Sequence, residues 1–130
     1  MRIARQLYDE IIAHAEAEAP NECVGLVASR DGEFVAVHRA RNAEASPLRF
    51  VIDSKEQYDL MMAIENAGLD VGAIYHSHTR SAPYPSQTDI NLAFYPDALY
   101  LIVGLAGDEP EVRAYEIRDG QVAEAELQVD

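Results

Sequence analysis

The chain has 130 residues, of which 48% are apolar, a net charge of −13 and a single cysteine, Cys23. This length predicts one domain over residues 1–130 and excludes an (α/β)8 barrel, which needs ~250 residues, while no apolar run reaches the ~18 residues of a membrane span. The negative charge disfavours nucleic acid as a partner because phosphates would be repelled, and the lone cysteine excludes both a disulfide framework and the paired cysteine ligands of zinc deaminases.

The N-terminal part of the chain predicts a helix followed by a β-hairpin. Its polar start is not that of a signal peptide, so we expect a cytoplasmic location. Apolar side chains at helical spacing indicate a helix over residues 4–19. Residues 23–28 have the continuous apolar character of a buried strand, and the Asp31-Gly32 turn joins them to an alternating partner strand over residues 33–40.

The middle of the chain predicts a strand, a helix and a second strand. After a polar loop, residues 48–52 are expected to form a short strand. Ser54-Lys55-Glu56-Gln57 resembles a capping box and opens a predicted helix that ends near Gly68. Residues 71–75 then read as a strand that runs directly into His76.

The C-terminal part predicts one short helix and three strands. The helix extends from Ser86 to about Phe94, and the apolar run over residues 98–105 is typical of a central strand. Two further strands, residues 111–117 and 121–128, flank the Asp119-Gly120 turn. The order of the elements predicts an α/β fold with one mixed sheet and helices packed on it.

Two histidines and an aspartate are spaced so that they could meet around a metal ion. If His76 and His78 lie on an extended segment, their side chains project from the same face. Asp89, arriving from the following helix, would complete a set of two nitrogens and one oxygen. Such a set suits Zn²⁺ and leaves the fourth tetrahedral position open for water, as in catalytic zinc sites. Packing is the usual explanation of an isolated His pair, but this pair lies where a strand leaves the core, which is where open α/β sheets place their sites.

Ser86 and Asp89 have a structural explanation beside the functional one. Serine followed three positions later by aspartate is typical of a helix N-cap, and an aspartate in the first turn compensates the helix dipole. Residues three apart also share a helix face, so Ser86 can point toward a substrate while Asp89 points toward a metal. From the residues alone, both explanations stay open.

Water on a metal needs a base, and the candidate is Glu22, at the junction of the first helix and the first strand. Spacing alone does not select it from 23 acidic residues, and an ordinary solvated carboxylate is the alternative. Cys23 is expected to be a small buried apolar residue. A thiolate hydrolase built on Cys23 and a histidine is the competing hypothesis, but strand alternation turns Cys23 away from the face that carries Glu22.

Together these residues resemble the signature of the JAMM (MPN+) metalloprotease family. Glu22, followed by His76-Ser77-His78, seven residues, Ser86, two residues and Asp89, matches it without a departure. The resemblance covers nearly the whole chain. Residues 75–79 and 82–89 look most like the compact bacterial members. Among those members, the chain is similar to the peptidases that release cysteine from the C-terminus of a ubiquitin-like sulfur carrier protein during cysteine biosynthesis.

The resemblance implies a mostly antiparallel, curved sheet flanked by about three helices and one zinc ion per chain. It implies a metallopeptidase that hydrolyses the amide bond after the flexible tail of the carrier. Family members bind that tail as an added strand, and residues 48–52 are the expected edge, with further substrate contacts unassigned. The implied site residues are the Zn²⁺ ligands His76, His78 and Asp89, the general acid/base Glu22 and the oxyanion-stabilising Ser86.

Two alternatives to carrier–cysteine hydrolysis are kept. The same chemistry could remove a bacterial ubiquitin-like protein from lysine, or the chain could be a non-catalytic scaffold of the same fold. Scaffold members of the family have usually lost ligand residues, whereas all the signature residues stand here. No membrane partner is expected, and the oligomeric state is left open between monomer and homodimer.

Overall fold

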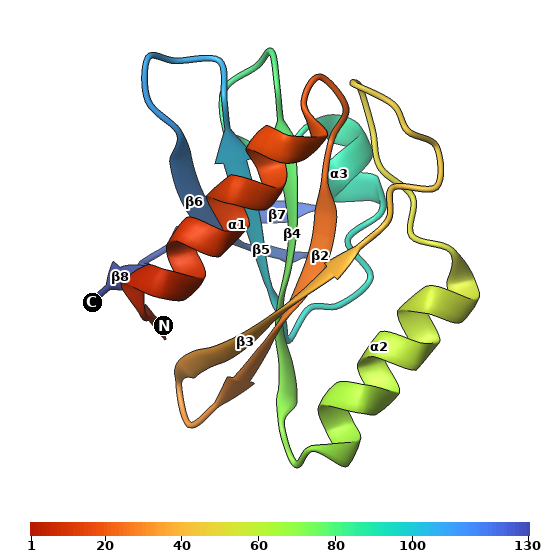
Figure 1. Ribbon diagram of the computed structural model, residues 1–130, viewed down its shortest axis with the longest axis vertical. Coiled ribbons are helices and arrows are strands. Elements are labelled where there is room, and N and C mark those ends of the chain that lie inside the picture. The colour runs from red at the N-terminus through yellow and green to blue at the C-terminus, as the bar shows by residue number, and fades with distance from the viewer.

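One curved, mixed sheet of eight strands organises the chain, with three helices packed on it (Figure 1). The computed structural model describes residues 1–130. In chain order the elements are β1 (Arg2–Ile3), α1 (Arg5–Glu18), β2 (Val24–Arg30), β3 (Glu33–Ala40), α2 (Ser54–Asn66), β4 (Asp70–His78), α3 (Gln87–Asn91), β5 (Leu99–Gly104), β6 (Glu111–Arg118), β7 (Gln121–Ala125) and β8 (Gln128–Val129).

The strand order in the sheet is β7-β6-β5-β4-β2-β3-β1-β8. The pairs β4–β5, β1–β3 and β1–β8 are parallel, and the four other pairs are antiparallel. The parallel β4–β5 pair needs a crossover connection, which contains α3. This arrangement confirms the predicted α/β class and the mostly antiparallel sheet.

The β2–β3 hairpin forms at the turn that the sequence predicts. Asp31 and Gly32 both have positive φ angles, 51° and 80°, as a two-residue hairpin turn requires. β2 is the more buried strand of the hairpin, because β4 pairs with it from Val24 to Ser29, whereas β1 pairs with β3 only at Glu33 and Phe34.

The sheet buries a separate apolar cluster on each face. One cluster contains Ile11 and Ala15 of α1 together with Tyr75, and Figure 1 shows α1 lying across that face. The other contains Ile64 of α2 together with Ile74, with Ile90 of α3 at its margin. Because neighbouring strand residues point to opposite faces, every second residue of β4 belongs to the face that carries α2 and α3.

The prediction of a strand over residues 48–52 is wrong, because that segment has no regular structure. Its backbone groups are bound within the loop that precedes α2: the Asn42 side chain accepts from Val51 N–H and donates to the Arg49 carbonyl, and Ala43 N–H donates to the Val51 carbonyl. Those bonds replace the ladder that a neighbouring strand would have supplied.

Two helix boundaries also differ from the predictions. α2 begins one residue earlier than the capping-box sequence suggests, because Asp53 is its N-cap and accepts from Glu56 N–H over 3.3 Å. α3 ends at Asn91 rather than near Phe94. Beyond it, Tyr95 N–H donates to the Tyr100 hydroxyl, which directs the chain into β5. None of the helices has the length and apolar character needed to cross a membrane.

The two termini lie side by side at one edge of the sheet, as Figure 1 shows. The sequence pattern did not predict β1, and it predicted β7 and β8 as one strand. In the structure β8 leaves β7 and pairs with β1, with Arg2 and Asp130 joined by an ion pair of 3.0 Å. Two-residue strands lack the length for an alternation pattern, so only the pairing reveals them.

Candidate metal centre

His76 and His78 are the last residues of β4 with side chains on the α2 and α3 face of the sheet. β4 is paired on both sides at His76, which lies opposite Val24 of β2 and Ile102 of β5, and on one side at His78, which lies opposite Gly104 of β5. Both imidazoles are buried, with only 1% of His76 and 5% of His78 exposed. The strand therefore places two imidazoles on one face of the sheet.

Asp89 reaches the same point from the first turn of α3. Its Oδ2 atom lies 3.2 Å from His76 Nε2 and 3.0 Å from His78 Nε2, and the two Nε2 atoms are 3.2 Å apart. The same carboxylate oxygen also accepts from Ser86 N–H over 2.9 Å. Ligand atoms of all three residues lie within 4.8 Å of one another, so the sequence-predicted ligands do converge.

Hydrogen bonds and neighbouring charges favour the tautomer and the protonation states of these groups that can bind a cation. His78 Nδ1 donates to the Ala82 carbonyl over 2.9 Å, which leaves the lone pair of neutral His78 on Nε2, facing the centre. Burial lowers the pKa of His76 and outweighs the opposing effect of Asp89. Burial acts to raise the pKa of Asp89, but its bonds with the two histidines outweigh burial and hold that pKa below its ordinary value.

The donor set fits a metal ion. Two imidazole nitrogens and one carboxylate oxygen aim electron pairs at a common point in a buried place, where unscreened lone pairs repel unless a cation lies between them. The His76 Nδ1 atom has no hydrogen-bond partner in the chain, so its contact with the centre is the main polar interaction of that ring. Three protein ligands leave a tetrahedral ion one open position.

Glu22 lies two residues before the start of β2, close enough to His78 and Asp89 for their charges to act on it. The carboxylate is buried, with 4% of the residue exposed, and its Oε1 atom has no hydrogen-bond partner. Burial raises the pKa of Glu22 to about 7; the negative charge of Asp89 adds to this effect and His78 opposes it. A carboxyl group with a pKa near neutrality can both accept and release a proton at physiological pH.

Cys23 does not form a thiolate site. It is 1% exposed and belongs to the apolar cluster under α1, on the face opposite the histidines. Burial raises the pKa of its thiol to about 12, so the thiol stays protonated. The hypothesis of a cysteine hydrolase is therefore not supported.

Ser86 is the N-cap of α3, as one of the two explanations from the sequence requires. Its hydroxyl oxygen accepts from Asp89 N–H over 3.1 Å, and Asp89 accepts in return from Ser86 N–H, which completes a capping box. The capping role uses the Ser86 oxygen only as an acceptor. Ser86 is exposed, and the capping box does not use its hydroxyl hydrogen, which can donate to another group.

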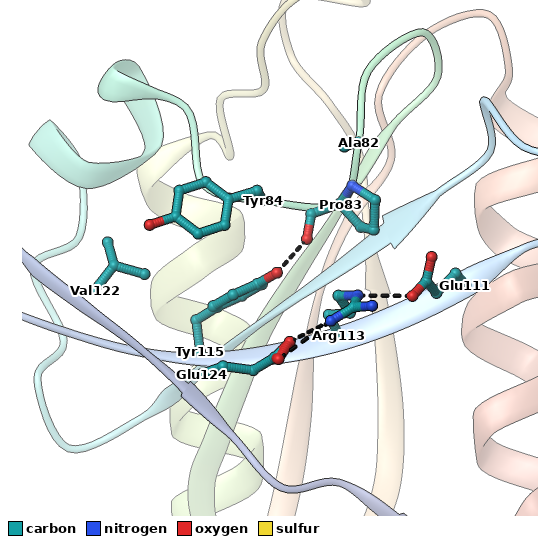
Figure 2. Close-up of a pocket in the computed structure, with 8 residues that line it drawn as sticks. All are labelled: Ala82, Pro83, Tyr84, Glu111, Arg113, Tyr115, Val122 and Glu124. Atoms are coloured by element: carbon teal, nitrogen blue, oxygen red, sulfur yellow. Dashed lines mark hydrogen bonds and ion pairs between the residues drawn. The ribbon is translucent and has the colours of Figure 1, made fainter.

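The loop between β4 and α3 is anchored to the neighbouring part of the sheet. Figure 2 shows the Tyr115 hydroxyl of β6 directed at the Pro83 carbonyl, a bond of 2.5 Å, with the Tyr84 ring packed edge-on against Tyr115. This bond lies next to Ala82, whose carbonyl accepts from His78. The loop and strands β6 and β7 also line an open cavity of about 470 Å³, in which Arg113 is paired with Glu111 and Glu124.

Phe50 is a site residue that the sequence did not indicate. Its ring lies over the His76 imidazole, with the ring centroids 4.5 Å apart. It also lines an apolar cavity of about 230 Å³ together with Ile74, Leu92 and Tyr95. A single phenylalanine in an irregular segment carries no spacing signal, so only its position in the fold reveals it.

Comparison with known proteins agrees with this geometry. The model of a family described as prokaryotic homologs of the JAB domain matches residues 4–118. The chain is 38% identical to a CysO-cysteine peptidase of Mycobacterium tuberculosis over 130 aligned positions, covering 98% of this chain and 89% of that protein. It is 37% identical to a desampylase of Haloferax volcanii over 109 positions, covering 78% of each chain.

Solved structures share the fold. The solution structure of a protein from Desulfitobacterium hafniense matches with a TM-score of 0.86 and 31% identity, covering all of this chain and 93% of that one. The crystal structure of a JAB1/MPN domain protein from Archaeoglobus fulgidus matches with a TM-score of 0.67 and 25% identity, covering 99% and 98% of the two chains.

Proposed function

Because this chain belongs to the family of prokaryotic homologs of the JAB domain, we propose that it is a zinc-dependent peptidase that cleaves the amide bond after the tail of a ubiquitin-like sulfur carrier protein, releasing cysteine. The observation that carries the proposal is the convergence of the His76, His78 and Asp89 ligand atoms within 4.8 Å, beside the buried carboxylate of Glu22. The relative named as a CysO-cysteine peptidase aligns with nearly the whole chain and supports this substrate.

In this proposal His76, His78 and Asp89 hold the ion. Two imidazoles and one carboxylate are the ligand types of catalytic zinc sites. When bound, zinc supplies Lewis acidity that makes water acidic near neutral pH and polarises a carbonyl group. The bond from His78 Nδ1 to Ala82 sets the tautomer that this role needs.

Glu22 acts as the general acid and base. Its raised pKa, about 7, allows it to accept a proton from the attacking water and then deliver it to the departing amine. The Oε1 atom has no partner in the chain, so it is available for that transfer. Loss of a positioned general base typically costs ~10²–10⁴ in rate.

Ser86 stabilises the carbonyl oxygen as it becomes negative. Its hydroxyl oxygen is fixed by Asp89 N–H, while its hydrogen is free to donate. Removing one such donor typically costs ~10²–10³ in rate, or roughly 3–4 kcal/mol. The capping box thus gives one serine both a structural and a catalytic role.

A second candidate substrate is a ubiquitin-like protein attached to lysine. The identity of 37% to a desampylase favours this substrate class, and the metal centre would serve both reactions equally. A non-catalytic scaffold is the remaining alternative.

Mass spectrometry of two adducts separates these hypotheses. A carrier–cysteine adduct and a carrier–lysine adduct are incubated with the zinc-loaded protein, with chelator-treated protein and with Glu22→Gln. We expect release of cysteine by the zinc-loaded wild type alone. Cleavage of only the lysine adduct would select the second candidate, and two intact adducts in the presence of a stoichiometrically metallated wild type would select the scaffold.

A further inference from the structure

Asn42 is a buried amide outside the ligand set, and all of its hydrogen-bonding capacity is used. It follows β3 and is 8% exposed. Its Nδ2 donates to the carbonyls of Glu22 and Arg49, each over 3.0 Å. Its Oδ1 accepts from Glu44 N–H over 3.2 Å and from Val51 N–H over 3.1 Å. Because two carbonyls face Nδ2 and two N–H groups face Oδ1, the amide can lie in only one orientation.

The first consequence concerns Glu22. The Glu22 carbonyl accepts from Asn42, and the Glu22 N–H donates to the Ser46 carbonyl over 2.8 Å. Both backbone groups of Glu22 are therefore held by one segment, residues 42–51, which we call the 42–51 loop. Because Oε1 of the carboxylate has no partner, these backbone bonds are the main polar restraint on where that oxygen lies.

The second consequence concerns Phe50. The Asn42 side chain binds both neighbours of Phe50 in the chain. It donates to the Arg49 carbonyl and accepts from Val51 N–H. The Phe50 ring between these two anchors lies over His76. One amide therefore connects the backbone that carries the general base to the ring that covers a ligand.

We propose that Asn42 is a positioning residue for the peptidase reaction: it locks the 42–51 loop so that Glu22 and Phe50 keep their places against His76. This inference rests on the proposed function for its effect on rate, but the lock itself is a property of the folded chain. An apolar residue could fill the same space, but only an amide offers two donors and two acceptors in one plane.

Kinetics of Asn42→Asp test the effect on rate. Aspartate is nearly isosteric and keeps the bonds from Glu44 and Val51, but it loses both donor bonds and faces two carbonyls. We expect kcat of the zinc-loaded enzyme to fall by about 10–100-fold, with a smaller change in KM, because a displaced base slows the chemical step. The matched control is Glu44→Ala, which removes an exposed ion pair with Arg49 in the same loop and should leave kcat within about twofold of wild type.

Fluorescence tests the lock without any catalytic readout. The chain has no tryptophan, so Phe50→Trp introduces a single indole against His76. In metal-free protein, adding Asn42→Asp to Phe50→Trp should shift the emission to longer wavelength and increase quenching by acrylamide. Adding Glu44→Ala should change neither.

Hydrogen exchange of the wild type covers the case in which Asn42→Asp does not fold. The N–H groups of Glu22 and Val51 should exchange as slowly as those of β2, because their partners belong to the lock. Exchange of these two groups at the rate of an open loop would overturn the proposal, as would unchanged emission and quenching in the double variant. A zinc-loaded wild type without peptidase activity would instead refute the proposed function. The exchange and fluorescence results would still show whether Asn42 holds the 42–51 loop in place.

Discussion

The Ser77 hydroxyl accepts the backbone N–H of Cys23 over 2.8 Å, and this bond joins the segment that carries Glu22 to the strand that carries both histidines. Ser77 stands between His76 and His78 but points to the opposite face of the sheet, where it is fully buried. The segment before β2 and strand β4 are therefore held together on the face of the sheet opposite the proposed metal centre.

Ser77→Ala tests this connection. The substitution leaves the buried Cys23 N–H without its acceptor, which should lower the free energy of unfolding by about 1–3 kcal/mol. Urea denaturation of metal-free protein measures this change, and kcat should fall as the start of β2 loosens. Ser81→Ala, in the exposed loop after β4, is the control and should be neutral. Equal stability of Ser77→Ala and wild type would show that the bond contributes little.

Removal of zinc should abolish the activity and reduce the stability. A chelator leaves the three ligands without their cation, whereas free zinc at 1,000 times its Kd should add about 4 kcal/mol to the free energy of unfolding. Asp89→Asn should weaken zinc binding, measured by calorimetry. The control is Asp97→Asn, which makes the same substitution at an aspartate whose side chain is fully exposed. Full activity in chelator would contradict the assignment of the metal centre.

Glu22→Gln should change how stability depends on pH in metal-free protein. The pKa of Glu22 is about 7 in the folded chain, against 4.5 for an ordinary glutamate, so the folded state binds the proton more tightly. Ionisation of Glu22 therefore destabilises the fold progressively as pH rises from about 4.5 to about 7. Glutamine cannot ionise, so the variant should become the more stable protein above pH 7, by about 1–3 kcal/mol.

Denaturation of both proteins across pH 4–9 measures the difference between their free energies of unfolding. That difference removes the pH dependence that the two proteins share and keeps the titration of Glu22, including its charge interactions with His78 and Asp89. It should grow over the window between the two pKa values and then level off. A constant difference would mean that the carboxyl group has the same pKa in the folded and the unfolded chain.

Tyr115→Phe should weaken zinc binding from a distance. The phenol anchors the Pro83 carbonyl (Figure 2). The carbonyl of the adjacent Ala82 accepts from His78 and orients its ring. Loss of an outer hydrogen-bond partner of a metal ligand typically costs about 10–100-fold in affinity, and we expect the lower end because Tyr115 acts through the loop. Tyr58→Phe, on an exposed part of α2, is the control. Identical zinc affinities for wild type and Tyr115→Phe would show that the Tyr115 bond does not help to orient His78.

Local patterns in the sequence predicted most of the elements that position the centre. The alternation through β4 placed His76 and His78 on one face, and the spacing of Ser86 and Asp89 predicted the capping box that the structure contains. These predictions succeed because strand alternation and helix capping depend on covalent geometry and on neighbours a few residues away. Glu22 was a candidate because it stands between the first helix and the first strand, but its distance along the chain from His76 carries no local signal that selects it from the other acidic residues, and the family resemblance supplied that choice.

The sequence by itself determined which chemistry is available: the donor types, their places on a strand and a helix, and a chain charge that repels phosphates. Only the tertiary structure decided where the groups meet and what holds them. Residues 48–52 have the composition of a strand, yet the Asn42 amide binds their backbone into a loop and sets Phe50 over His76. The physical reason is that such bonds join residues remote in sequence, and their energy exists only after the fold has brought both partners together.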